Sequence, residues 1–496
     1  MDKYNILMIC SDQHRADITG CSGNSVIDTP NIDRLARDGM TFDSAYCNSP
    51  VCVPSRMSFL TGRFCFHIDA LTNGSILDSR IPTVANMLNA SGYHTVLDGR
   101  MHFQGSDQRH GFTERIMGDF APYFLAGAKG DRYKTFAPLS EAVPNGNVPD
   151  PLLEVGPGNT SVIDFDREVT HRACEWLKTY PTECNTPFFM TVGYFAPHCP
   201  YICPPELYRK YDGRVPLFEP GEAELDRLHP YHREFRERSQ LAEVPKQNLR
   251  KATTAYYGLV DFVDGNVGRI LDVLEKRGLL DSTIIVYYSD HGEMLGEHGR
   301  WHKSCFYEGS MRVPLIIRQP GANSAGTVVK ENVSLVDLAP TLCEWAGYET
   351  PPAFDGDSLA DAVAGKPLEP NRIIRSEYYN YTGSNRCAVQ GNWKLSYYGG
   401  FGSYELYNPA DDPKELTNRA GTPGTQRVFR RLKDALFEDG WHVELLDRYN
   451  RFYHEVGLMD VLKGTRRHIP NDPLITDIPG YWKDIVACEN YVRPDD

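Results

Sequence analysis

The sequence has no run of about 18 apolar residues, the length that a helix needs to span a bilayer. Its first residues, MDKYNILMIC, also lack the basic stretch, the longer apolar stretch and the small-residue cleavage site of a secretory leader. These absences argue against a membrane-spanning class for the sequence as written. They predict a cytoplasmic protein without a membrane partner.

Positive charge is in short supply as well. The chain has 52 Lys and Arg residues against 66 Asp and Glu residues, a formal net charge of −14. A surface that binds nucleic acid needs clustered Lys and Arg to release counterions from the phosphates. We therefore expect no nucleic-acid partner, and an anionic substrate would need a local positive site.

Paired cysteines are also missing. The 13 cysteines are an odd number, spread from Cys10 to Cys488, and none has CxxC spacing. This pattern argues against both a disulfide framework and a structural zinc site. Cys199 and Cys203 come nearest to a ligand pair, but the prolines around them indicate a loop. Most of the cysteines are expected to be small buried side chains.

Alternating apolar strands and amphipathic helices are what the chain does contain. Short apolar runs predict buried strands over 5–10, 93–99, 187–197 and 283–290. Periodic stretches predict helices over 29–39, 81–92, 165–180 and 249–278, the first capped by Thr29 and ended by Gly39. This alternation predicts the α/β class, with a mainly parallel sheet and helices on both faces.

The character of the sequence changes after about residue 370. Short aromatic segments typical of strands follow, and then a helix is predicted around 426–437. We predict a catalytic domain over 1–370 and a small antiparallel α+β domain with a tail over 371–496. The stretch 445–496 has no clear period. We expect it to pack on the main body or on another subunit, which would make the protein a homo-oligomer.

Two acidic residues follow the ends of predicted strands. Asp12 comes after the first strand, and Asp290 stands at the very end of the strand over 283–290. Because the carboxyl ends of parallel strands share one edge of a sheet, we expect the two carboxylates to meet there. Cys52, in SPVCVPSRMSFLTGR, begins a predicted helix, where amide donors and Arg56 favour anions. A buried structural thiol is the other interpretation of Cys52.

A family resemblance appears around this cysteine. Cys52, Pro54 and Arg56 match the Cys-x-Pro-x-Arg core of the type I, formylglycine-dependent sulfatases of the alkaline phosphatase superfamily. Other segments resemble the family in family order between about residues 5 and 418: NILMICSDQ, TPNIDRLARDGMTF, GYHTVLDGRMHF, APHCPY, SDHGEMLGEHGRWHKSCFYEGSMRVPLI and ELYNPADDPKELTN. The motifs are most similar to choline-sulfatase-like members. The resemblance implies an alkaline-phosphatase-like fold and hydrolysis of a carbohydrate sulfate or a small alkyl or choline-type sulfate.

The resemblance also implies roles on the nucleophile side of the site. Cys52 would be oxidised to formylglycine by a maturing enzyme, and the hydrated aldehyde would attack sulfur. Arg56 would hold the formylglycine and the carboxylates of the metal site by paired hydrogen bonds. His102 is the candidate base that breaks the sulfated intermediate.

On the substrate side, His198 and Lys303 resemble the pair that grips sulfate and protonates the leaving oxygen. Arg100 stands where the family usually has lysine; it can pair with sulfate but does not readily lose a proton. Asn73 resembles an asparagine that contacts the anion in related enzymes, although Asn73-Gly74 could simply form a turn.

The candidate ligands for one divalent metal are Asp12, Gln13, the modified Cys52, Asp290 and His291. Oxygen ligands suit calcium, which the family implies, with magnesium as an alternative. The imidazole of His291 favours manganese or zinc, so manganese also remains open. Asp12 could instead cap a helix, and His291 could be a core histidine. We expect Asp290→Ala to abolish turnover with little effect on folding.

Specificity and two other functions stay open at this point. The tryptophan expected after DQRHGF in choline sulfatases is absent. Tyr123, Phe124, Glu377, Tyr378 and Tyr379 could contact substrate or could only pack. Phosphonate monoester and phosphodiester hydrolases resemble the chain at the same site positions and are the alternative enzyme. A non-catalytic protein that binds sulfated ligands is the alternative of another class, and the intact catalytic set argues against it.

Overall fold

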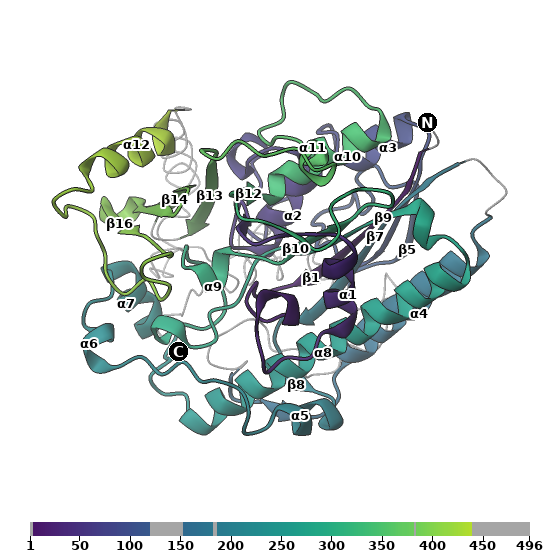
Figure 1. Cartoon of the computed structure of the whole chain (residues 1–496). Coiled ribbons are helices and arrows are strands. Elements are labelled where there is room, and N and C mark those ends of the chain that lie inside the picture. The colour runs from purple at the N-terminus through teal and green to yellow at the C-terminus, as the bar shows by residue number, and fades with distance from the viewer. Residues whose placement is uncertain (1–2, 120–151, 182–185, 381–382, 439–496) are drawn as a thin grey trace, which may run out of the picture.

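The computed structural model describes residues 3–119, 152–181, 186–380 and 383–438. Its centre is an eight-stranded sheet in the order β11-β2-β10-β9-β1-β7-β4-β5 (Figure 1). The strands are β1 (Asn5–Asp12), β2 (Met40–Phe42), β4 (His94–Gly99), β5 (Glu114–Met117), β7 (Phe188–Pro197), β9 (Thr283–Ser289), β10 (Leu315–Arg318) and β11 (Thr327–Val329). Strand β10 is antiparallel to both neighbours, and the other pairs are parallel. The predicted α/β class is confirmed.

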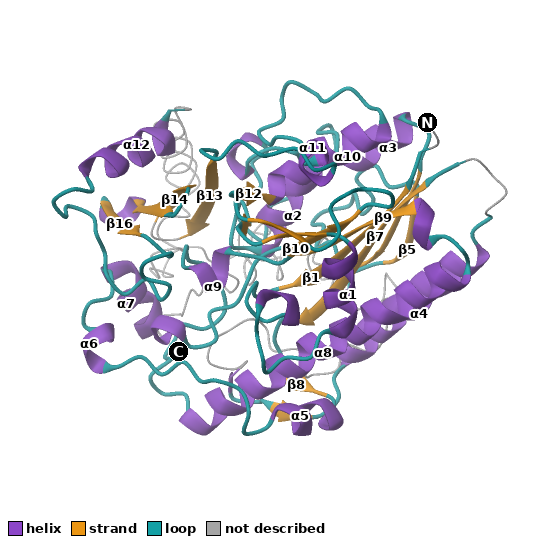
Figure 2. Cartoon of the chain, in the orientation of Figure 1, coloured by secondary structure: helices purple, strands orange, loops and turns teal. Residues whose placement is uncertain are grey.

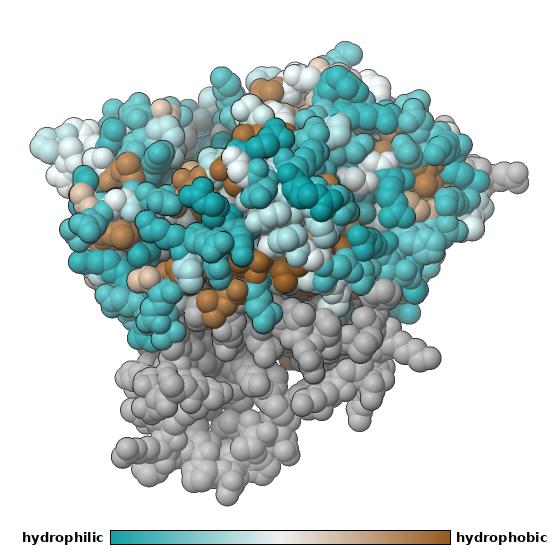
Figure 3. All heavy atoms as spheres, turned by 90° about the horizontal axis from the view of Figure 1, so that it is seen from below, coloured by the Kyte–Doolittle hydropathy of each residue, from teal (hydrophilic) through white to brown (hydrophobic). Residues whose placement is uncertain are grey.

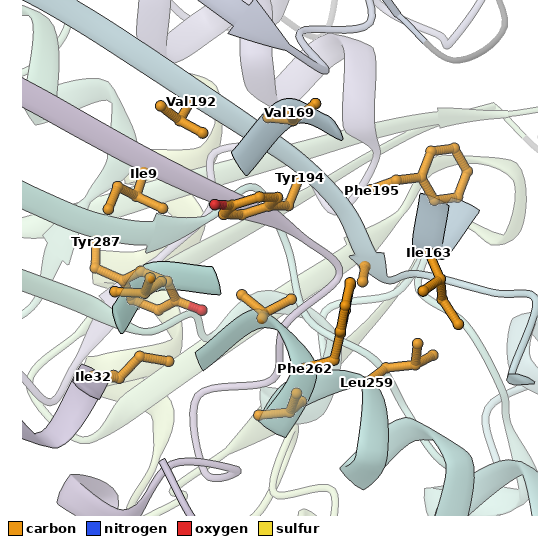
Figure 4. Close-up of a cluster of buried hydrophobic side chains, with 14 of the residues drawn as sticks. Ile9, Ile32, Ile163, Val169, Val192, Tyr194, Phe195, Leu259, Phe262 and Tyr287 are labelled. Carbon is orange, nitrogen blue, oxygen red and sulfur yellow. The ribbon is translucent and has the colours of Figure 1, made fainter. Parts of the chain in front are cut away.

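Helices cover both faces of this sheet. One face carries α1 (Pro30–Asp38), α4 (Ser161–Thr179) and α8 (Lys246–Lys276), and the other carries α2 (Cys52–Thr61), α3 (Val84–Ala90) and α10 (Leu338–Ala346). Successive residues of β1 alternate between the two cores, with Ile9 in one and Met8 in the other. Figure 4 shows Ile9 and Tyr287 of the sheet beside Ile32 of α1. Burial on both faces explains why β1 is continuously apolar.

The start of α1 differs from the prediction. Thr29 occupies the position before the helix, but its side chain makes no capping hydrogen bond to the first turn. Instead, the Asp264 carboxylate of α8 accepts the backbone N–H groups of Asn31 at 3.0 Å and of Ile32 at 2.8 Å. Sequence could not indicate this cap, because its acceptor lies more than 200 residues away in the chain.

A second, antiparallel sheet follows in the chain. It consists of β13 (Ile373–Asn380), β14 (Gly383–Gln390), β15 (Trp393–Tyr398) and β16 (Ser403–Tyr407), and α12 (Gln426–Phe437) packs on it (Figure 2). This confirms the small antiparallel α+β unit, whose first strand begins close to the boundary predicted at residue 370. The division into two domains itself stays a prediction. The tail over 445–496, with the oligomer expected through it, and Tyr123 and Phe124 lie outside the described residues.

The described chain also contains shorter strands and α-helices. They are β3 (Ala45–Tyr46), β6 (Gly156–Pro157), β8 (Ile202–Cys203), β12 (Val333–Ser334), α5 (Pro205–Tyr211), α6 (Glu222–Leu225), α7 (Pro230–Arg238), α9 (Glu308–Met311) and α11 (Ala360–Val363). Within the described ranges, none of the helices combines the length and apolar character needed to cross a membrane. Figure 3 shows hydrophilic residues over most of the described face that it draws, with hydrophobic residues in small groups between them.

Candidate active site

The two acids from separate strand ends do meet. Asp12 is the last residue of β1, and Asp290 directly follows β9, its parallel neighbour, with Ser11 paired to Ser289. Together with Cys52 and His291 they form a buried group whose candidate ligand atoms all lie within 4.8 Å of one another. Two carboxylates, an imidazole and the side-chain position of residue 52 therefore converge on one point at the sheet edge.

The imidazole of His291 is oriented for ligation. Its Nδ1 lies 3.0 Å from the carbonyl oxygen of Gly292 and can only donate to it. Its Nε2 is then the unprotonated nitrogen of the neutral ring, and it lies 3.1 Å from the Sγ of Cys52. Burial alone would lower the pKa of His291, but Asp290 and Cys52 outweigh it and the pKa is raised. His291 therefore lies among the candidate ligand atoms, with its Nε2 toward residue 52.

Cys52 is the first residue of α2, as predicted. Val51 before it supplies no side-chain cap, and the N–H of Val53 is accepted by Asn73 Oδ1 at 2.9 Å. Gly62 ends the helix in a left-handed conformation with φ of 68°. Asn73 therefore supports the turn that presents residue 52.

Arg56 bridges the two acids. Its Nε donates to Asp290 Oδ2 at 2.8 Å, its Nη2 to Asp12 Oδ2 at 3.1 Å, and its Nη1 to the carbonyl of Arg100 at 2.9 Å. The guanidinium is fully buried, so these bonds replace its hydration. Burial would raise the pKa of Asp12, but the guanidinium groups of Arg100 and Arg56 hold it well below its usual value. Asp12 is therefore ionised.

Arg100 is held by several contacts at once. Its Nε donates to Asp12 Oδ2 at 2.6 Å, its Nη2 lies 3.0 Å from Nδ1 of His102, and its guanidinium stacks on the ring of Phe195. The backbone approaches β7 so closely that a Cβ on Gly193 would lie 1.8 Å from the Arg100 carbonyl oxygen. Only glycine fits at that position of the strand.

His102 sits in a left-handed backbone conformation, with φ of 60°. Asp119 Oδ1 accepts the N–H groups of Met101 at 3.2 Å and His102 at 2.8 Å, which holds this turn. Burial and Arg100 lower the pKa of His102 well below its usual value, so the ring is neutral. Because Arg100 can only donate, Nδ1 accepts and the ring hydrogen lies on Nε2.

Lys303 faces the other side of the site. Its Nζ lies 2.7 Å from His198 Nε2 and 2.6 Å from Gln13 Oε1. His198 Nδ1 donates to the carbonyl of Cys199 at 2.8 Å, so its Nε2 accepts from the lysine. Burial and Lys303 lower the pKa of His198, whereas Cys52 and Asp12 outweigh burial and raise the pKa of Lys303. The pair thus consists of a charged lysine and a neutral histidine.

The structure brings the predicted residues together and adds others that the sequence did not single out. Glu293, two residues after His291, turns inward and accepts from Gln13 Nε2 at 2.5 Å. Asp119 fixes the turn at His102. Both acids stood in or near segments that resemble the family, but nothing in the sequence separates an inward carboxylate from a solvated one.

The aromatic and acidic residues of β13 are buried. Glu377, Tyr378 and Tyr379 are each 1% exposed. The Tyr379 hydroxyl donates to Glu377 Oε2 at 2.6 Å, and the N–H of Phe66 donates to Glu377 Oε1 at 3.1 Å. These two hydrogen bonds lie within the fold, which favours the packing interpretation.

Comparisons with known proteins agree with this geometry. The family model described as Sulfatase matches residues 4–348, and the model of the C-terminal part of N-sulphoglucosamine sulphohydrolase matches residues 296–440. A choline-sulfatase from Rhizobium meliloti is 32% identical, over 90% of this chain and 88% of that protein. Iduronate 2-sulfatase from Homo sapiens is 30% identical, over 71% of this chain and 70% of that protein.

Solved structures resemble the chain over most of its length. A protein solved with its substrate D-glucosamine-2-N,6-O-disulfate has a TM-score of 0.70 at 25% identity, covering 89% of this chain and 98% of that one. A phosphonate monoester hydrolase of Agrobacterium radiobacter has a TM-score of 0.74 at 24% identity, covering 89% and 96%; this likeness concerns the fold alone. With the family model matching more than half of its residues, the chain belongs to the sulfatase family and is a sulfuric ester hydrolase.

Proposed function

We propose that the protein hydrolyses a sulfate monoester, of a sugar or of a small alkyl or choline-type alcohol, with formylglycine made from Cys52 and one divalent metal. The observation that carries this proposal is the position of Cys52. It begins α2 within 4.8 Å of the ligand atoms of Asp12, Asp290 and His291. A purely structural thiol has no need of two carboxyl groups and an oriented imidazole around it.

The donor set fits a divalent cation. Asp12, Asp290 and His291 would hold it with residue 52, and Gln13 Oε1 is the further candidate ligand. The metal, when bound, would polarise the sulfate oxygens and lower the pKa of the nucleophile. Calcium is our first choice because carboxylate and amide oxygens are hard ligands, with manganese and magnesium as alternatives.

Maturation is the first chemical step of the proposal. A maturing enzyme with an external oxidant removes two electrons from the CH₂–SH group of Cys52; water supplies the aldehyde oxygen and sulfur leaves as hydrogen sulfide. The hydrated aldehyde supplies two hydroxyls on one carbon, one to attack sulfur and one whose deprotonation expels sulfate. Arg56 keeps both acids in place around this residue through its bonds to Asp12 and Asp290.

The remaining residues handle the anion and the protons. Lys303 and Arg100 would face the sulfate oxygens, and the leaving oxygen would take its proton from the Lys303–His198 pair. Asn73, whose Oδ1 is bound to Val53, has its amide NH₂ group left for the anion. His102 would accept a proton at Nδ1 once Arg100 turns from it to sulfate, because Nε2 carries the ring hydrogen.

Mass spectrometry of the peptide with residue 52 tests the maturation step. In protein from its native host we expect loss of the thiol and gain of an aldehyde. Full activity of protein that still carries the unmodified Cys52 would refute the proposal. Metal content measured in the same preparation, before and after chelation, identifies the cation, and chelation is expected to lower both turnover and the thermal unfolding midpoint.

A substrate panel separates the sulfatase from the alternative hydrolase. Sulfate monoesters, phosphonate monoesters and phosphate diesters all carry one negative charge, so the cations of this site do not discriminate among them strongly. The phosphonate hydrolase alternative rests on the shared Asp12-Gln13, Cys52 and Asp290-His291 pattern. We expect sugar or alkyl sulfates to be turned over with the highest kcat/KM. Diester turnover far above sulfate turnover would reverse this ranking.

A further inference from the structure

Glu293 is a buried carboxylate that the proposed chemistry leaves unused. It is fully buried, and both of its oxygens are engaged. Oε1 accepts the N–H groups of Leu295 at 2.9 Å and His302 at 2.6 Å. Oε2 accepts the hydroxyl of Tyr201 at 2.8 Å and the amide Nε2 of Gln13 at 2.5 Å. A carboxylate with four donors has a fixed orientation.

This contact decides which way the Gln13 amide points. A carboxylate only accepts, so Gln13 must present its NH₂ group to Glu293. The amide oxygen then faces the opposite side, where the Nζ of Lys303 lies 2.6 Å away. The backbone of Gln13 is fixed as well, in a left-handed conformation with φ of 69°, by a bond from its N–H to Asp290 at 3.1 Å.

We propose that Glu293 is a positioning residue: it sets the orientation of the Gln13 amide and thereby the place of the Lys303 ammonium beside His198. The inference rests on the function proposed for this site. It also explains why position 13 carries an amide. A carboxylate there would lie against the buried carboxylate of Glu293, and like charges without solvent repel strongly.

Exchange of the two side chains separates positioning from a merely structural role. In Glu293→Gln, the N–H groups of Leu295 and His302 hold the amide oxygen of the new glutamine, so its NH₂ group faces the NH₂ group of Gln13. Gln13 must then turn its NH₂ group toward Lys303. In Gln13→Glu, two carboxylates face each other. In the double variant, the amide at 293 donates to the carboxylate at 13, which keeps an oxygen for Lys303. Tyr201 can then donate to His302 Nδ1, 3.2 Å away.

The experiment measures kcat/KM for an alkyl sulfate and a nitrophenyl sulfate in wild type, both single variants and the double variant. We expect each single variant to lose about 10- to 100-fold on the alkyl sulfate. The loss on the nitrophenyl ester is expected to be smaller, because its leaving group needs no proton. The double variant should recover most of the activity.

Glu297→Gln is the matched control in the same segment. Glu297 pairs with Arg15, and the activity of the variant should stay within about twofold of wild type.

Equal losses on both esters, or losses in the double variant equal to the product of the single ones, would overturn the inference. Unfolding midpoints of the four proteins are measured as well, since contact between the two side chains predicts recovery of stability in the double variant. A wild type that cleaves no sulfate ester would refute the proposed function. In that case the unfolding midpoints alone test the inference. If the loss of stability in the double variant equals the sum of the losses in the two single variants, the inference is overturned.

Discussion

At the scale of single residues, the site is a set of mutually paired charges. Arg56 and Arg100 both donate to Asp12, and Arg56 also holds Asp290. All of these side chains are nearly or fully buried. Removal of one partner therefore leaves another charge without solvent, so chemistry and stability are coupled here.

Asp290 shows this coupling. Its Oδ1 accepts the N–H groups of Gln13 and His291, and its Oδ2 accepts Arg56 Nε. The expectation that Asp290→Ala would hardly affect folding therefore needs correction, because three donors would lose their acceptor. We now expect Asp290→Ala to abolish turnover and to reduce the free energy of unfolding by about 3–5 kcal/mol. Denaturant unfolding measures the loss, and an unchanged midpoint would contradict this account.

Arg100→Lys tests whether the site needs the planar guanidinium of Arg100 or only its positive charge. The guanidinium reaches Asp12 and His102 together and stacks on Phe195, whereas an ammonium is a single point charge. We expect kcat/KM for sulfate esters to fall about 10- to 100-fold while the unfolding midpoint changes little. Arg167→Lys, at an exposed pair on α4, is the control and should behave like wild type. Wild-type kcat/KM in Arg100→Lys would show that a positive charge at position 100 is enough for turnover.

At the scale of elements, strand ends and helix starts carry the site. The end of β7, which leads into His198, is held by an acid from α4. Asp166 accepts the N–H groups of Phe195 and Ala196, both at 2.8 Å. Burial nevertheless raises the pKa of Asp166 from 3.8 to about 7. The folded protein therefore keeps a proton on Asp166 over a pH range in which the unfolded chain has lost it.

This shift predicts a pH dependence of stability. Between about pH 4 and 7 the folded state binds the extra proton, so the free energy of unfolding decreases as pH rises through this window and levels off above it. The contribution of Asp166 amounts to about 2 kcal/mol between pH 5 and 7. Asp166→Asn should lower stability overall, because an amide offers one acceptor for two donors, and should reduce this slope. Urea unfolding at both pH values tests it; an unchanged slope would assign the effect to other groups.

At the scale of the whole molecule, a buried triad of one lysine and two glutamates joins the small sheet to the main body. Lys394 of β15 lies 2.7 Å from Glu308 of α9 and 2.6 Å from Glu415. Burial raises the pKa of Glu415 to about 8, and Lys394 counteracts this rise. The small sheet is thus attached to the segment that follows Lys303 by charges that have little access to water.

Lys394→Met is expected to weaken this attachment. It leaves the buried Glu308 carboxylate without its cation, at a loss of about 3–5 kcal/mol in the free energy of unfolding. Lys366→Met, which removes an exposed pair with Asp361, is the control and should leave the unfolding midpoint close to that of wild type. Denaturant midpoints of both variants measure the difference. Similar midpoints would mean that the triad does not stabilise the joined structure.

The sequence by itself determined the main features of the fold. The run 5–10 is apolar at every position because β1 is buried on both faces, and such a run predicts a central parallel strand. The helix from Cys52 and the convergence of Asp12 with Asp290 follow from local periodicity and from the shared edge of parallel strands. Those features depend on residues that are near in the chain or on general rules of topology.

Only the tertiary structure decided how the side chains pair. The cap of α1 comes from Asp264 and not from Thr29, and Glu293 turns inward to Gln13. The hydrogen of His102 lies on Nε2 because Arg100 donates to Nδ1. Hydrogen-bond direction, burial and the pKa shifts that follow depend on groups that are brought together across the fold. Residue types in sequence order do not contain those distances, and the chemistry of the site depends on them.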